Sequence, residues 1–163
     1  REVFDEVAAD YQQIARDYAY TDAFCQWLPR EPERYDVVVA PNFSGDVITD
    51  LAAVLQGGMG LAASGNIGDR HAMFEPIHGS APPLAGTDTA NPVATLLALR
   101  MMLDWLGKEK DLVRLCDAGD RLERAIANTL SRPEGRTEDL GGGGSCSGVG
   151  ELVLQAFEKE LGG

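Results

Sequence analysis

Two aspartates with helical spacing are the first residues of this chain that could bind a ligand. Asp46 and Asp50 lie four residues apart in DVITDLAAVLQ, a segment whose apolar residues recur as on a helix. Side chains four residues apart share one helix face, about 5–6 Å from each other, and two carboxylates there repel unless a cation lies between them. Mg²⁺ typically takes one or two carboxylates together with water and substrate oxygens. The same spacing is common on exposed acidic helix faces, so the residues alone leave both interpretations open.

A second pattern, GMGLAA at residues 58–63, matches the dinucleotide fingerprint G-x-G-x-x-A. That fingerprint requires a strand before it and a helix N-terminus after it. Here a predicted helix precedes it and a glycine-rich segment follows. We therefore predict no Rossmann phosphate site, but a loop whose backbone approaches a neighbour closely.

A third candidate is EPIHGSAP at residues 75–82, a rigid polar loop that contains His78, one of the two histidines. A single loop histidine is more often a surface residue than a catalytic one, and no Ser/His/Asp or Cys/His order indicates acyl transfer. The three cysteines, Cys25, Cys116 and Cys146, are too widely spaced for a zinc motif or a disulfide framework. We expect free thiols in a reducing cytoplasm.

The elements that must position these residues follow an α/β pattern. YDVVVA at residues 35–40 is a β-branched apolar run, the signature of a buried and parallel strand. A helix is expected after it, with Ser44 as its N-cap. Ligands of α/β folds lie beyond the carboxyl ends of strands. The loop after this strand is therefore where we expect chemistry.

The rest of the chain is expected to be mainly helical. Segment 57–68 contains too many glycines for regular structure to be predicted, and a short strand is expected at 72–74. Asn91 and Pro92 have the types preferred at the N-cap and first position of a helix, and Gly107 is expected to end that helix. The helices are predicted at 3–17, 23–28, 93–106, 111–130 and 149–161.

Composition and charge narrow the class of protein. The 163 residues carry a formal net charge of −12, from 14 Lys plus Arg against 26 Asp plus Glu. So acidic a surface repels phosphate backbones and anionic membranes, which argues against nucleic-acid and lipid partners. No apolar run is long enough for a membrane span and no signal peptide is visible. Because the first residue is Arg1 and not Met, we interpret the chain as cut from a longer one.

Taken together, these segments resemble a known family, the β-decarboxylating dehydrogenases that include isocitrate and isopropylmalate dehydrogenases. YDVVVAPNFSGDVITDLAA resembles the family's metal-binding segment, and GLAASGNIG, AMFEPIHGSAPPLAGTDTANP and RTEDLGGGGS follow in its order and spacing. The resemblance covers essentially the whole chain. It implies the C-terminal part of an α/β, non-Rossmann, isopropylmalate-dehydrogenase-like fold. Residues 1–56 would complete the dimer-forming, metal-binding lobe, and residues 57–163 the cofactor-binding lobe.

The resemblance also implies a metal site. Asp46 and Asp50 correspond to carboxylates that bind Mg²⁺ or Mn²⁺, and Asp22 to the position that reaches the metal of the other subunit in a homodimer with a shared active site. In the family the metal chelates a 2-hydroxy acid and acts as a Lewis acid during oxidation and decarboxylation. The family's general-base lysine, catalytic tyrosine and substrate arginines precede the part that this chain matches. No catalytic residue is therefore expected within it, and the chain alone is expected to be inactive.

NAD is the cofactor that the resemblance implies. Asn42 would lie near the nicotinamide and Glu75 near its ribose, while His78 would pack on the adenine. Pro83-Leu84 stands where NAD-using members have Asp and NADP-using isocitrate members have Lys-Tyr, so neither determinant is present. NAD is preferred because no cation within the loop could hold a 2′-phosphate. The implied cofactor-binding residues are Asn42, Glu75, His78, Gly79, Ser80, Ala81, Leu84 and Asn91.

The resemblance is compatible with several substrates. FEPIHGSAP resembles isopropylmalate and tartrate/malate members more than bacterial isocitrate members, so 3-isopropylmalate is the first candidate. Tartrate or malate, and homoisocitrate or isocitrate, stay open, because the residues that contact the substrate's 3-substituent lie outside this chain. A non-catalytic regulatory subunit is an alternative from another class. The presence of all three aspartates argues against it.

Overall fold

The computed structural model describes residues 1–162. The chain divides into two compact units, the first from Arg1 to Ile48 and the second from Thr49 onward. These units are groups of mutually contacting residues within this chain. The predicted lobes, 1–56 and 57–163, refer to a longer protein and stay a prediction.

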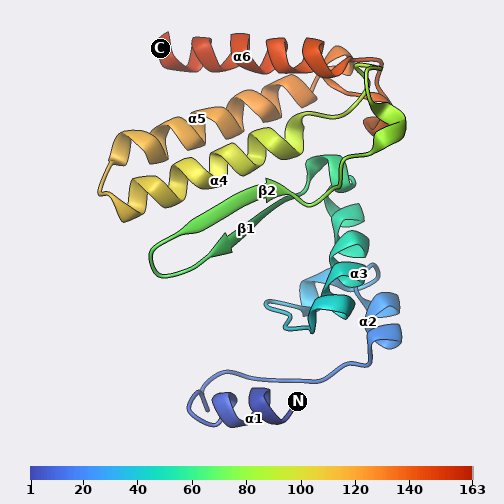
Figure 1. Ribbon diagram of the computed structural model, residues 1–163, viewed down its shortest axis with the longest axis vertical. Coiled ribbons are helices and arrows are strands. Elements are labelled where there is room, and N and C mark those ends of the chain that lie inside the picture. The colour runs from blue at the N-terminus through green and yellow to red at the C-terminus, as the bar shows by residue number, and fades with distance from the viewer. Residues whose placement is uncertain (163) are drawn as a thin grey trace. The chain divides into compact units, whose positions relative to one another are not determined.

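The first unit is built of short helices joined by irregular segments (Figure 1). It contains α1 (Glu2–Ala8), α2 (Thr21–Trp27), a 3-10 turn at Pro32–Arg34 and the start of α3 (Asn42–Ala53). Its small core is Phe24 with Leu28, and the ring of Phe24 packs edge-on against Tyr35 at a centroid distance of 4.8 Å. The helix predicted at 3–17 ends at Ala8, because most of its apolar side chains find no partner and short helices depend on such packing.

The predicted strand at residues 35–40 is wrong for this structure. The segment is irregular, and Val37 and Val39 are 87% and 73% exposed. A strand forms only when its N–H and C=O groups pair with a neighbouring strand, and no strand is described in the first unit. The β-branched residues therefore indicate a local preference for extended backbone, but they do not show whether a neighbouring strand is present to pair with it.

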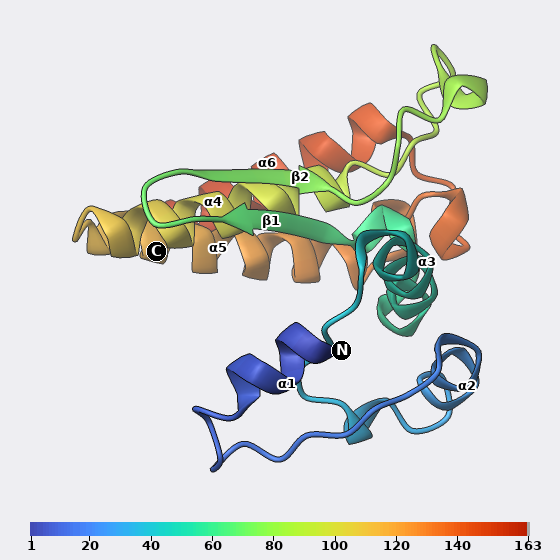
Figure 2. The same ribbon diagram turned by 60° about the horizontal axis from the view of Figure 1, so that its bottom comes forward.

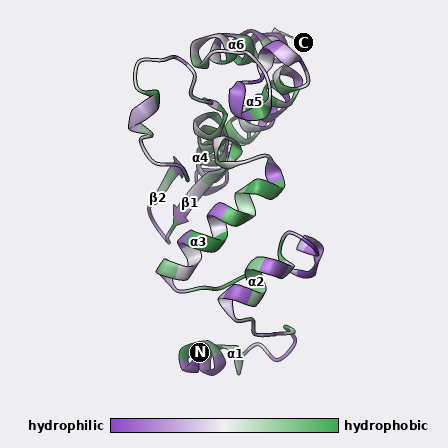
Figure 3. Cartoon of the chain, turned by 90° about the vertical axis from the view of Figure 1, so that its right-hand side faces the viewer, coloured by the Kyte–Doolittle hydropathy of each residue, from purple (hydrophilic) through white to green (hydrophobic). Residues whose placement is uncertain are grey.

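Helix α3 begins at Asn42, two residues before the predicted N-cap Ser44. The first helical bond runs from the Gly45 N–H to the Pro41 carbonyl at 2.7 Å, so the helix starts directly after the proline. Hydrophobic and hydrophilic segments alternate along it (Figure 3). It is followed by a 3-10 turn, Val54–Gln56, and stops at Gly57, whose φ of +108° is left-handed and favours glycine.

The second unit contains an antiparallel hairpin of β1 (Ala63–Ile67) and β2 (Ala72–Pro76). The short strand predicted at 72–74 is confirmed, whereas the prediction that 57–68 lacks regular structure is wrong. Gly65 pairs with Phe74, and a Cβ at Gly65 would come within 3.1 Å of that ring. The glycine thus gives the aromatic ring room to lie across the strand, from where it packs near Trp105 of α4 at 6.2 Å between ring centroids.

Three long helices form the body of this unit: α4 (Val93–Glu109), α5 (Val113–Leu130) and α6 (Cys146–Gly162). The hairpin lies along α4, and α5 lies between α4 and α6 (Figures 1 and 2). Gly107 does not end α4 as predicted but is buried within it. A Cβ there would lie 2.4 Å from the Cys116 sulfur, so the glycine permits a close crossing of α4 and α5. The core consists of Val93, Leu122, Ala125, Ile126, Val149 and Val153.

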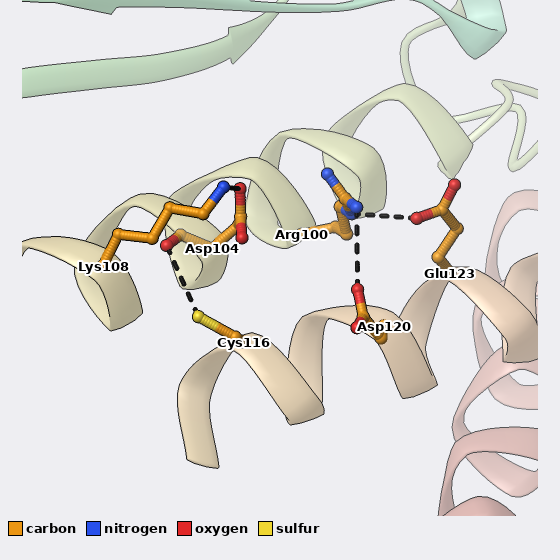
Figure 4. Close-up of polar contacts among 6 residues, drawn as sticks. All are labelled: Arg100, Asp104, Lys108, Cys116, Asp120 and Glu123. Atoms are coloured by element: carbon orange, nitrogen blue, oxygen red, sulfur yellow. Dashed lines mark hydrogen bonds and ion pairs between the residues drawn. The ribbon is translucent and has the colours of Figure 1, made fainter. Parts of the chain in front are cut away.

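Charged side chains border the contact of α4 and α5 (Figure 4). Arg100 of α4 approaches two carboxylates of α5, Glu123 with Nε and Oε2 2.9 Å apart and Asp120 with Nη2 and Oδ1 3.7 Å apart. Along α4, Lys108 Nζ lies 2.8 Å from Asp104 Oδ2.

Among the described residues, no helix is long and apolar enough to cross a membrane.

Candidate functional site

The two aspartates predicted to bind a metal lie on one continuous helix. Asp46 and Asp50 are four residues apart on α3, so the helical spacing on which the prediction rests is confirmed. Both residues are exposed, and Asp46 Oδ2 accepts a hydrogen bond from Asn42 Nδ2 at 3.4 Å. Their carboxylate oxygens are hard ligands of the kind that Mg²⁺ and Mn²⁺ prefer. The donor set therefore fits a divalent cation that takes its other ligands from substrate, water or another chain.

Asp22, the third predicted ligand, lies in the first turn of α2 and is exposed. Its Oδ1 accepts a hydrogen bond from the Ala23 N–H at 2.8 Å. Within residues 1–162, no three His, Cys, Asp or Glu side chains gather so that they could hold a metal. The structure thus places two of the three predicted carboxylates on one helix, α3, and the third on another, α2.

The predicted cofactor loop follows directly from the hairpin. Strand β2 ends at Pro76, His78 is half-buried with Nδ1 3.0 Å from the Gly79 carbonyl oxygen, and residues 79–90 are all exposed. Ala81 has a left-handed backbone, with φ of +42°, and a 3-10 turn at Pro82–Leu84 follows. The predicted residues thus run from the end of β2, where Glu75 lies, through the half-buried His78 into an exposed segment that contains Gly79, Ser80, Ala81 and Leu84.

Asn91, predicted to hold the adenosine, closes this loop at the start of α4. Its Oδ1 accepts the Val93 N–H at 3.0 Å. The helix starts at Val93 with Pro92 as its N-cap, so the predicted start, Asn91 as N-cap and Pro92 as first helical residue, is one residue too early. Asn91 Nδ2 donates to Asp139 Oδ2, also at 3.0 Å. The amide is therefore oriented by two protein contacts.

Asp88 is a loop residue whose role sequence reasoning missed. Its Oδ1 accepts the Ser147 N–H at 2.9 Å, and its Oδ2 accepts the Ser147 hydroxyl at 2.5 Å. These hydrogen bonds, the hydroxyl first and the backbone N–H second, hold the pKa of the Asp88 carboxyl below its ordinary value. The serines of GSCSG, just before an apolar helical run, were the available signal for a helix N-terminus at this point.

Two surface hollows of the structure lie away from these residues. One of about 360 Å³ is lined by Ala9, Gln12, Ile14 and Arg16, and another of about 230 Å³ lies between the end of α5 and α6. None of the residues predicted for metal or cofactor lines either hollow. The residues predicted for metal and cofactor thus lie on a helix face and a loop that are largely exposed in the described part of the chain.

Comparison with known proteins shows the family of this chain. Residues 1–153 match the family model described as isocitrate/isopropylmalate dehydrogenase. The chain belongs to this family. This confirms the resemblance drawn from the sequence motifs, and with it the isopropylmalate-dehydrogenase-like fold.

Members of the isocitrate/isopropylmalate dehydrogenase family are similar to this chain over most of its length. An isocitrate/homoisocitrate dehydrogenase of Thermus thermophilus is 44% identical over 94% of the chain and 44% of its own length. A 3-isopropylmalate dehydrogenase of Streptomyces griseus is 49% identical over 79% of the chain and 39% of its own length. The crystal structure of isocitrate dehydrogenase from Methylococcus capsulatus matches with a TM-score of 0.85 at 36% identity, over 96% of this chain and 44% of that one. The chain thus spans less than half the length of these relatives.

Proposed function

We propose that this chain is the C-terminal part of a longer enzyme, here called the parent protein, that catalyses metal-dependent oxidative decarboxylation of a 2-hydroxy acid with NAD as hydride acceptor. The observation that carries the proposal is the combination of two aspartates on one helix with an exposed HGSAP loop, in a chain of the isocitrate/isopropylmalate dehydrogenase family. The relatives named above are dehydrogenases.

Asp46 and Asp50 would hold a Mg²⁺ or Mn²⁺ ion from α3, with Asp22 contributed by the partner subunit. When bound, such a cation polarises hydroxyl and carbonyl oxygens, which favours both hydride loss and decarboxylation. The two carboxylates supply negative charge that offsets the charge of the cation, and Asn42 fixes the position of Asp46 through its amide. Because two like charges on adjacent helical turns repel each other, the cation also relieves this repulsion.

The loop from Glu75 to Asn91 would hold the NAD. His78 would pack on the adenine ring, and the backbone groups of Gly79, Ser80 and Ala81 would bind the adenosine together with the Asn91 amide. Leu84 would line the same site without a charge. The preference for NAD over NADP is supported by the lack of Lys and Arg between residues 75 and 91.

A homodimer in the cytoplasm is part of the proposal. A shared active site would explain why Asp22 lies on a different element from Asp46 and Asp50. It would also explain the exposed apolar side chains of the first unit, of which Phe43 is 83% exposed. Exposed apolar side chains that gather in a contiguous patch commonly mark interfaces.

The first candidate substrate is 3-isopropylmalate, for which the FEPIHGSAP loop argues. A second candidate is isocitrate or homoisocitrate, favoured by the identity of 44% to the Thermus thermophilus relative over nearly the whole chain. All three acids share the 2-hydroxyl, the α-carboxylate and the departing β-carboxylate. They differ in the 3-substituent, which residues outside this chain would contact.

The test is dinucleotide reduction by the parent protein, followed at 340 nm. NAD and NADP are supplied separately, with Mg²⁺ or Mn²⁺, against 3-isopropylmalate, isocitrate, homoisocitrate, tartrate and malate. We expect metal-dependent reduction of NAD with one acid, abolished by a chelator and restored by the metal. A folded dimer that reduces neither dinucleotide with any acid would overturn the proposal in favour of a regulatory subunit.

A further inference from the structure

We propose that Asp88 is a positioning residue of the cofactor loop, which it fastens to the N-terminus of α6 and thereby holds ready for the dinucleotide. The inference rests on the proposed function, since it assigns NAD to the loop of residues 75–91. It goes beyond it by naming what orders that loop. Asp88 is not itself among the residues proposed to contact NAD.

Asp88 accepts hydrogen bonds from backbone N–H groups in the first turn of α6, although it lies 59 residues before Ser147 in the sequence. Its backbone carbonyl accepts the Cys146 N–H at 2.7 Å, and its Oδ1 accepts the Ser147 N–H at 2.9 Å. The next N–H, that of Gly148, is bound by the Ser145 hydroxyl at 3.1 Å. The first N–H groups of a helix have no partner within the helix and need one from outside. Asp88 supplies two of the three partners, so the loop functions as the cap.

The charge and the hydroxyl strengthen this link. A carboxylate at a helix N-terminus is stabilised by the helix dipole, and hydrogen bonds to an ionised group are stronger than those between neutral groups. Asp88 Oδ2 also accepts the Ser147 hydroxyl. The same hydrogen bonds lower the pKa of Asp88, as expected when they favour the ionised carboxylate.

The backbone of Asp88 has a conformation that few residue types adopt easily. Asp88 has φ of +57°, one of three residues other than glycine with positive φ among those described. Asp and Asn tolerate this left-handed region better than most residues. Glycine would be easier to accommodate in this backbone state, yet the residue here is an aspartate whose carboxylate accepts two hydrogen bonds from Ser147.

The far side of the link is rigid. α6 is held in the core by Val149 and Val153, which are 1% and 2% exposed. By contrast, residues 79–90 are entirely exposed and gain no support from burial. Within the loop, the Thr87 hydroxyl donates to the Leu84 carbonyl at 2.8 Å, so the 3-10 turn and the Asp88 link form one connected segment. An exposed loop ordered before binding loses less conformational entropy when the ligand arrives.

The experiment compares NAD binding by three variants of the parent protein with the unaltered protein, using calorimetry or fluorescence. Asp88→Gly removes the carboxylate without backbone strain, and we expect the dissociation constant for NAD to rise about tenfold, with the turnover number at saturating NAD unchanged. Asp88→Asn keeps an acceptor and the left-handed preference, and should bind within about threefold of the unaltered protein. Amide hydrogen exchange in residues 79–90 should quicken in Asp88→Gly and slow again when NAD saturates it.

Asp111→Gly is the matched control. Asp111 is also exposed with a positive φ, of +51°, but lies in the turn between α4 and α5. NAD binding should be unchanged in it. Should Asp88→Gly fail to fold, Ser147→Ala removes only the hydroxyl from the link and should weaken NAD binding about two- to threefold.

The outcomes separate the two levels of the proposal. If the unaltered parent protein binds no dinucleotide, the proposed function is overturned, and the role of Asp88 falls with it. If it binds NAD and Asp88→Gly binds equally well, only the positioning role is overturned. A loss of turnover or thermal stability in Asp88→Gly with an unchanged NAD dissociation constant would likewise reduce Asp88 to a structural cap.

Discussion

The amide of Asn91 donates to the carboxylate of Asp139 across 48 residues of sequence, with Nδ2 and Oδ2 3.0 Å apart. The other oxygen of Asp139 accepts from the Thr137 hydroxyl, whose residue is buried. Gly60 lies against both partners: a Cβ there would be 2.6 Å from Asp139 Oδ2 and 2.9 Å from Asn91 Nδ2. The GMGLAA segment is thus a place of close backbone approach, as predicted, and the groups that it approaches orient a candidate cofactor ligand.

Gly60→Ala should therefore destabilise the parent protein by about 1–3 kcal/mol, the usual cost of inserting a methyl group where there is no room. It should also weaken NAD binding, because the hydrogen bond that orients Asn91 must break. Urea denaturation and NAD calorimetry check the two effects. Gly143→Ala is the control, since a Cβ at Gly143 has nothing within 4 Å and its φ is not left-handed. Equal stability of the two variants would contradict the close approach.

Asp46→Asn should remove metal-dependent activity while the protein stays folded. The amide keeps the size of the side chain but loses the charge that a divalent cation requires. Because even the partners behind metal ligands are worth roughly 10–100-fold in affinity, we expect Mg²⁺ or Mn²⁺ affinity to fall on the order of 100-fold. Asp10→Asn, at an exposed position on another segment, should leave it unchanged. Normal metal-dependent turnover in Asp46→Asn would remove α3 from the metal site.

His78→Ala should raise the Michaelis constant for NAD more than it lowers turnover. Loss of the ring proposed to stack on adenine is expected to weaken binding about tenfold, while the reacting nicotinamide lies at the other end of the cofactor. His71→Ala is the matched control, because His71 is exposed and its described contact uses the backbone carbonyl, which accepts from Gly68 at 3.0 Å. An unchanged dependence on NAD in His78→Ala would exclude the stacking role.

Local patterns predicted the three long helices well and the pairing of strands poorly, and the N-terminal helix has less than half its predicted length. α4, α5 and α6 follow from apolar periodicity, and each lies within three residues of its predicted start. The β1 strand was missed because its sequence, ASGNI, has little strand preference and is held by its partner and by the Phe74 ring over Gly65. The 35–40 segment failed for the opposite reason: it has the preference and lacks the partner. Pairing depends on distant residues, which no local pattern contains.

The same distinction between local patterns and distant contacts applies to the candidate site. Asp46 and Asp50 could be paired from sequence, since helical spacing alone places them on one face. The link from Asp88 to Ser147 and that from Asn91 to Asp139 could not, because each joins segments 48 or more residues apart. Only the three-dimensional arrangement brings them together.

The Asp104–Lys108 pair on α4 gives a prediction about pH. Hydrogen bonding to the Lys108 ammonium lowers the pKa of Asp104 from its ordinary 3.8, and the same bond raises the pKa of Lys108 above its ordinary 10.5. Groups shifted in these directions stabilise the folded state where both are charged. The contribution of Asp104 is complete above pH 3.8 and is lost as the pH falls through its lower folded value. That of Lys108 is complete below pH 10.5 and is lost as the pH rises through its higher folded value.

Lys108→Gln should therefore lower the denaturation midpoint slightly at pH 7, and by less in acid once Asp104 is protonated. The effect should be small, because Lys108 is largely exposed and exposed pairs on one helix face contribute little. In the variant the pKa of Asp104, read from its side-chain carboxyl signal in NMR titration, should rise toward 3.8. Lys110→Gln is the control, since Lys110 follows α4 and has no described side-chain bond to Asp104. If the Asp104 titration is the same in both variants, the ion pair drawn in Figure 4 does not set its pKa.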